Sequence, residues 1–141
     1  MHTILELIDC FKKNNYTCLI ANKGEIVFTA FDKGVKPLLD FYQAQKEHKM
    51  NHLQLIDKVI GKGAAFLCVL IGIKEIHTRV ISKSALTVLE RNGIPVSYEI
   101  LTDYIMNAKK DGHCPVETIS EEHDDPESFY PALLNFFAKR E

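Results

Sequence analysis

The stretch 57-DKVIGKGAAFLCVLIG-72 decides the fold, because almost all of its residues are apolar or small. Asp57 suits the N-cap of a helix and Gly72 suits a C-terminal stop, so we predict a helix between these two residues. A helix that is apolar on most sides must also be buried on most sides. The sequence therefore predicts a central helix around which the other elements pack.

Upstream of this stretch, the sequence predicts a helix, a β-hairpin and a second helix. Apolar residues recur at helical spacing over residues 3–14, with Thr3 as the N-cap. Strands are expected at 16–21 and 25–31, on either side of a turn in which Gly24 permits positive φ. The second helix begins near Pro37, a residue that suits a first helical turn.

Downstream, the strand predicted over residues 74–81 is unusual. Glu75, His77 and Arg79 alternate in it with Ile, Thr and Val. A parallel strand that is covered on both faces is normally an almost continuous apolar run. One face of this strand is therefore expected to meet water, a pocket or a second subunit.

The remaining elements complete an α/β pattern. A helix capped by Ser82 ends near Gly93, a strand covers residues 95–100, and short helices begin at Thr102 and Pro115 before a last helix from Pro126. We predict a three-layer α/β/α architecture with a mixed sheet of about four or five strands, opened by the β-hairpin. Residues 1–141 are expected to form one domain, with an N-terminal helix at 3–14, a core at about 15–100 and C-terminal helices at about 102–139.

The composition of the chain argues against several classes of function. The 141 residues carry a formal net charge of −2, which argues against a nucleic-acid partner. The longest apolar stretch, residues 63–73, is too short to span a bilayer, and residues 1–3 lead into an amphipathic segment rather than a signal peptide. The four cysteines show no disulfide or metal spacing and are expected to be reduced thiols, so we predict a cytoplasmic protein.

Five motifs carry a resemblance to a known family. In chain order they are Gly34–Leu39, Asp57–Ala65, Ser82–Leu86, Gly93–Tyr98 and Cys114–Glu117. Together they resemble domain of unknown function (DUF) family 1893, over about residues 15–130. The resemblance implies a variant of the cytidine deaminase fold, and it implies no particular reaction.

The zinc ligands of deaminases are missing from this sequence. Zinc deaminases carry a His-x-Glu or Cys-x-Glu motif at the start of the central helix and a Pro-Cys-x-x-Cys motif at the start of the next. The first motif falls on residues 59–62, which contain no His, Cys or Glu, and the two cysteines of the second are replaced by Ser82 and Ala85. Because zinc needs such ligands, we predict no metal, no cofactor and no zinc-dependent deamination.

The starts of the two helices are nevertheless expected to point at one place. A helix N-terminus presents unpaired N–H groups and a partial positive charge, so two such ends favour a small anionic or nucleotide-like ligand. On the alternative interpretation, the polar residues only cap helices, the lysines are solvated and the glycines permit tight packing. The predicted ligand-binding residues are Asp57, Lys58, Gly61, Lys62, Ser82, Lys83, Ser84, Cys114 and Glu117.

An enzyme of unknown reaction is a second hypothesis. Cys114 stands at a predicted helix start, where the helix dipole favours a thiolate, and it is the candidate catalytic residue. His113 and His123 are the candidate bases nearest to it in sequence. Lys58 and Lys62, predicted to share one helical face, are the other candidates. Alternatively, Cys114 and Glu117 only cap their helix.

A third hypothesis is a homo-oligomeric interaction module without a ligand. The last helix carries Phe129, Tyr130, Phe136 and Phe137, more aromatic surface than one sheet face requires. Together with the mixed strand at 74–81, this surface predicts self-association, and a homodimer is the commonest form.

Overall fold

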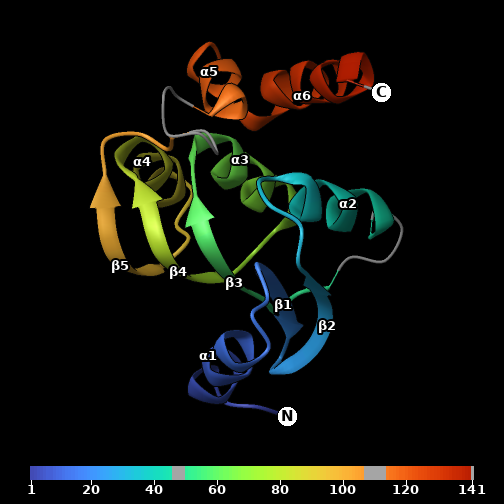
Figure 1. The fold of residues 1–141 in the computed structure, drawn as a ribbon, viewed down its shortest axis with the longest axis vertical. Coiled ribbons are helices and arrows are strands. Elements are labelled where there is room, and N and C mark those ends of the chain that lie inside the picture. The colour runs from blue at the N-terminus through green and yellow to red at the C-terminus, as the bar shows by residue number, and fades with distance from the viewer. Residues whose placement is uncertain (46–49, 107–113, 141) are drawn as a thin grey trace.

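The computed structural model describes residues 1–45, 50–106 and 114–140. These residues form an α/β fold with a five-stranded mixed sheet in the order β2-β1-β3-β4-β5 (Figure 1). The strands are β1 (Cys18–Asn22), β2 (Glu25–Ala30), β3 (Leu53–Ile60), β4 (Glu75–Ser82) and β5 (Val96–Thr102). The helices are α1 (Ile4–Lys13), α2 (Lys36–Ala44), α3 (Lys62–Ile71), α4 (Lys83–Arg91), α5 (Pro115–Glu121) and α6 (Pro126–Arg140).

The predicted N-terminal elements are confirmed. Thr3 caps α1 through a capping box with Glu6, in which each side chain accepts from the other residue's backbone N–H. β1 and β2 pair antiparallel, and Lys23 and Gly24 in the turn between them both have positive φ, at 52° and 84°. A turn of this kind matches the twist of the strands that it joins.

The predicted start of the central helix is wrong. Residues 57–60 belong to β3, and α3 begins only at Lys62, with Gly61 as its N-cap. β3 runs parallel to β4, with Leu55 opposite Ile76. Val59 and Ile60 are apolar and β-branched, and so short an apolar run fits a strand as well as a helix. Because Asp57 lies within β3, it is not a helix cap.

The predicted helix at Thr102 is also wrong. Thr102 is the last residue of β5, where it lies opposite Ser82 of β4. The described residues that follow, 103–106, contain no helix, and residues 107–113 lie outside the described part of the chain.

Most of the helices gather on one face of the sheet, the covered face. Its core contains Ile20 of β1, Leu55 of β3 and Ile76 of β4, packed against the buried α3. α3 in turn contacts α2, α4, α5 and α6. This arrangement bears out the prediction of a central helix buried on most sides.

The opposite face of the sheet, the open face, carries only α1 among the described helices. Leu7 and Phe11 of α1 pack on Leu19 of β1 and Ile56 of β3 in a separate core cluster. In Figure 1, α1 stands apart from the other five helices. The second helix layer is thus a single helix over β1 and β3, and no described helix lies on this face of β4 and β5.

The aromatic residues of α6 belong mainly to the core. Phe129 is fully buried against Phe66 of α3, with ring centroids 5.2 Å apart, and Phe136 and Phe137 pack at the edge of the same cluster. Tyr130 stacks edge-on with Tyr42 of α2. These contacts remove α6 as the reason for expecting self-association. Among the described helices, none is both long enough and apolar enough to cross a membrane.

Replacing Phe129 tests this assignment of α6. We expect Phe129→Ala to lower the free energy of unfolding by about 3–5 kcal/mol, because it leaves a cavity beside α3. Phe137→Ala, at a partly buried position of the same helix, is the matched control and should lower the free energy of unfolding by clearly less. Chemical denaturation measures both values, and equal costs would contradict the burial pattern described for α6.

Candidate functional site

The starts of α3 and α4 lie together, as the sequence predicts. β3 and β4 are parallel neighbours, so Gly61, which follows β3, and Ser82, the last residue of β4, lie at one edge of the sheet. We call this edge, where β3, β4 and β5 end, the carboxyl edge. Ligands of open α/β sheets commonly bind at such an edge.

A carboxylate of the protein itself occupies the tip of α3. Glu117 of α5 is only 4% exposed, and its Oε1 accepts a hydrogen bond of 2.6 Å from the backbone N–H of Lys62. A Cβ added at Gly61 would lie 1.8 Å from the same oxygen, so only glycine leaves room for this carboxylate. An anionic side chain at a helix N-terminus is stabilising. Glu117 therefore takes the position that the anion hypothesis gave to a ligand.

The tip of α4 is capped internally as well. Ser82 is fully buried, and its Oγ accepts from the backbone N–H of Ala85 at 3.2 Å and lies 3.3 Å from Ser84 Oγ. Lys83 is exposed and forms a 2.7 Å ion pair with Asp103. Lys62 Nζ lies over the ring of Phe66, 5.5 Å from its centre. These contacts agree with the alternative interpretation, in which these residues cap helices and support packing.

Cys114 stands directly before α5, as predicted, and is half-buried. Its backbone N–H donates to the carbonyl of Ile105 at 2.9 Å, which ties α5 to the segment after β5. His113 lies outside the described residues, and His123 Nδ1 lies 3.0 Å from Ser128 Oγ of α6. His123 thus contacts α6, and the nucleophilic role of Cys114 stays a prediction.

Metal ligands do not gather in the described residues. In residues 1–45, 50–106 and 114–140, no three His, Cys, Asp or Glu side chains are grouped so that they could hold a metal ion. The tips of α3 and α4 hold Gly61, Lys62, Ser82 and Lys83.

Asp57 and Lys58 lie elsewhere than predicted. Both are on β3, so Lys58 and Lys62 do not share a helical face, and the proposed lysine pair is wrong. Asp57 is 8% exposed, and burial raises its pKa to about 8, against weak hydrogen bonding from the backbone N–H groups of Val59 and Lys58. Burial, together with the nearby Asp57, also raises the pKa of the Cys18 and Cys68 thiols. Asp57 is therefore mostly uncharged at neutral pH.

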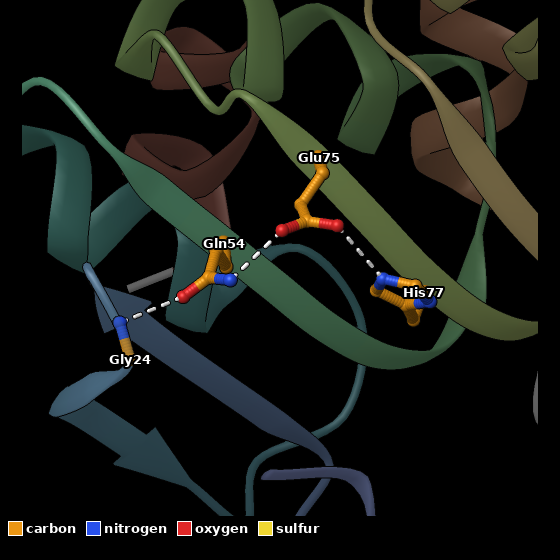
Figure 2. A network of polar contacts seen from close by, with 4 residues as sticks. All are labelled: Gly24, Gln54, Glu75 and His77. Carbon is orange, nitrogen blue, oxygen red and sulfur yellow. Dashed lines mark hydrogen bonds and ion pairs between the residues drawn. The ribbon is translucent and has the colours of Figure 1, made fainter. Parts of the chain in front are cut away.

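A polar network crosses the open face. Gln54 of β3 accepts from the backbone N–H of Gly24 at 3.0 Å and donates to Glu75 Oε1 at 2.8 Å. The other oxygen of Glu75 lies 3.1 Å from His77 Nε2 on the same strand (Figure 2). The network thus runs from the hairpin turn to His77 and fixes the orientation of its ring. Its hydrogen bonds from Gln54 and His77 lower the pKa of Glu75.

His77 also lines a groove of about 560 Å³, the open-face groove. The groove lies between α1 and the neighbouring strands, with residues 56–59, 77–80 and 97–99 as its floor and rim. Lys12, Lys58 and Arg79 bring positive charge to it, and no ion pair holds any of the three within the described part of the chain. This volume is in the range of small-molecule sites.

Only some of the residues that line this groove could be predicted from the sequence. The alternation of Glu75, His77 and Arg79 correctly predicts a strand with one uncovered face. Lys12 and Tyr98 were missed, because they come from α1 and β5 and meet β4 only in the folded chain. Spacing along one strand cannot show this meeting.

Comparisons with known proteins agree with the resemblance seen in the sequence. A family model described as "Domain of unknown function (DUF1893)" matches residues 6–137. The chain also superimposes on the crystal structure of a DUF1893 family protein, TM1506 from Thermotoga maritima, with a TM-score of 0.85. The two are 28% identical, and the match covers 94% of this chain and 88% of the other. No curated protein matches the chain significantly.

A double-mutant cycle tests the carboxylate at the tip of α3. We expect Gly61→Ala to lower the free energy of unfolding by about 1–3 kcal/mol, because the new methyl group overlaps the Glu117 carboxylate. Glu117→Ala should also destabilise, because it leaves the buried N–H of Lys62 without this acceptor. The double variant should be more stable than the sum of the two losses predicts. Strict additivity would show that the two residues do not compete for one space.

The burial of Asp57 predicts a pH dependence of stability. Its folded pKa of about 8 lies above its ordinary value of 3.8, so the folded protein holds a proton that the unfolded chain releases. Stability from this group is therefore complete below about pH 4 and falls as the pH rises towards 8. Asp57→Asn lacks this titration, so its free energy of unfolding should rise by several kcal/mol relative to that of the wild type over this interval. Denaturation at several pH values checks this, with Asp32→Asn at an exposed position as control, and a constant difference would contradict it.

Proposed function

The chain belongs to the DUF1893 family, whose function is unknown, and we propose that it binds a small anionic, nucleotide-like molecule in the open-face groove. The observation that carries this proposal is the convergence of Lys12, Lys58 and Arg79 on a groove of about 560 Å³. Two of the predicted ligand-binding residues, Asp57 and Lys58, line the same groove. The ligand class therefore stays as the sequence predicts, and its place moves from the helix tips to the sheet face.

The charge balance of the groove favours an anion. Besides its three cations, two acidic residues line the groove, Asp57 and Glu99, and the Asp57 carboxyl lies near the Cys18 and Cys68 thiols of the covered core. Because burial raises the pKa of Asp57 to about 8, this residue adds little negative charge at neutral pH. At the tip of α3, by contrast, the Glu117 carboxylate would repel a second anion.

The remaining groove residues suit the other half of such a ligand. Ile8, Phe11 and Val80 supply apolar surface for a planar ring. His77, oriented by Glu75, offers a hydrogen-bonding edge beside Ser97, its neighbour in the register of β4 and β5. A phosphate or carboxylate joined to a ring thus finds complementary groups on both sides.

The scaffold itself is, in this proposal, a zinc-free variant of the cytidine deaminase fold. The starts of α3 and α4 at the ends of adjacent parallel strands support this assignment. The protein then acts as a binding domain rather than as a zinc-dependent deaminase. A cytoplasmic location fits the four free cysteines.

Titration with cytidine 5′-monophosphate tests the proposal. In an amide-resolved NMR titration, shifts should concentrate in residues 56–59, 77–80 and 97–99, and cytidine without its phosphate should bind much more weakly. Arg79→Gln and Lys58→Gln should each weaken the nucleotide about tenfold, since each removes a charged partner. Arg91→Gln, on α4 away from the groove, is the matched control.

Two results of the same titration would contradict the proposal. Shifts confined to residues 61–63 and 82–85 would return the ligand to the helix tips. Binding that is unchanged in Arg79→Gln and Lys58→Gln would show that the cations of the groove do not recognise the anion.

A further inference from the structure

β5 is an edge of the sheet with one side unpaired in the described structure. It pairs with β4 along residues 96–102, and it is the last strand in the sheet order. The backbone N–H and C=O groups on its outer side therefore have no strand to pair with among the described elements. A long edge strand of this kind is a template for another strand.

The side chains of this edge are apolar rather than protective. The exposed large hydrophobic residues that gather on β5 and just after it are Tyr98, Ile100, Leu101, Tyr104 and Met106. Within β5 itself, Glu99 is the one charged residue, and the strand contains neither lysine nor proline. Charges, prolines and bulges are the usual means by which proteins block pairing at an edge, and β5 uses only Glu99.

The other edge of the sheet, β2, also exposes apolar residues, Ile26 and Val27, but its strand pairing is irregular. β2 pairs with β1 through a register shift between Ile20 and Ala21, and such irregularities twist an edge away from flat pairing. The N-terminal segment also covers its turn, because the His2 backbone N–H donates to the carbonyl of Gly24 at 2.9 Å. The two edges thus differ in how open they are to a new strand.

We propose that β5 pairs antiparallel with β5 of a second copy of this chain, around a two-fold axis at Ile100. This register places Ile100 against Ile100 of the second copy and Tyr98 against Thr102. Cross-strand pairs of these types are stabilising. Glu99 then faces Leu101 rather than another Glu99, so no like charges oppose each other. The sequence of β5 is therefore complementary to itself, which is the reason to name a second copy as the partner.

The pairing also connects the interface with the open-face groove. Ser97, Tyr98 and Glu99 form the outer rim of that groove. A second β5 beside this rim extends the floor of the groove into a continuous sheet of two copies. The strand pairing needs only the edge of β5, so it does not depend on whether the proposed ligand binds.

Sedimentation velocity tests this interface with two matched variants. The wild-type chain should sediment as a concentration-dependent dimer. Ile100→Lys places two ammonium groups at the axis and should raise the dissociation constant on the order of 100-fold or more. Val27→Lys makes the same change at an exposed position of β2 and should leave the dimer intact. Unchanged circular dichroism in both variants shows that the fold is retained.

Three outcomes would overturn the proposal. The first is a wild-type protein that stays monomeric at every concentration. The second is an Ile100→Lys variant that dimerises like the wild type. The third is dissociation by Val27→Lys alone, which would place the interface at β2. If Ile100→Lys fails to fold, Leu101→Lys takes its place, with the same expected dissociation.

Discussion

The burial of α3 is the constraint on which the rest of the structure depends. This helix is apolar on most sides, with Ala64, Ala65, Phe66, Leu67 and Cys68 all buried. A helix of this composition is stable only when other elements cover it all round. The sheet covers one side, and α2, α4, α5 and α6 contact the others. Because α3 is apolar on most sides, four further helices pack around it on one face of the sheet.

The packing of these helices around α3 leaves the opposite face of the sheet open. With five helices on the covered face, α1 is the one described helix left for the other side, and it packs on β1 and β3. The side chains of β4 on this face are accordingly polar, with Glu75, His77 and Arg79 in a row. The buried Glu117 has the opposite effect at the carboxyl edge, because it fills the tip of α3 from within. The groove that we propose as the ligand site therefore lies on the sheet face.

The sequence predicted the elements well and their boundaries less well. Caps and turns are encoded locally, so α1, the hairpin and the Ser82 cap were found from a few residues each. The whole of β3, residues 53–60, was missed as a strand, because short apolar runs suit a buried strand and a buried helix equally. The prediction of the site contained the same error, because the pairing of Lys58 with Lys62 required one continuous helix. Glu117 was predicted to bind a ligand or to cap its own helix, and its contact with Lys62 was missed, because it spans 55 residues and cannot be read from local spacing.

Solvent paramagnetic relaxation, measured by NMR with a neutral gadolinium chelate, tests most directly that the sheet is covered on one face and open on the other. We predict strong relaxation of side-chain protons of the exposed Lys58, Arg79 and Glu99. We predict protection of Leu55 and Ile76, which lie on the covered face of the same strands. Equal protection of both sets would contradict this prediction, because it would show that the face assigned to the ligand groove is covered in solution.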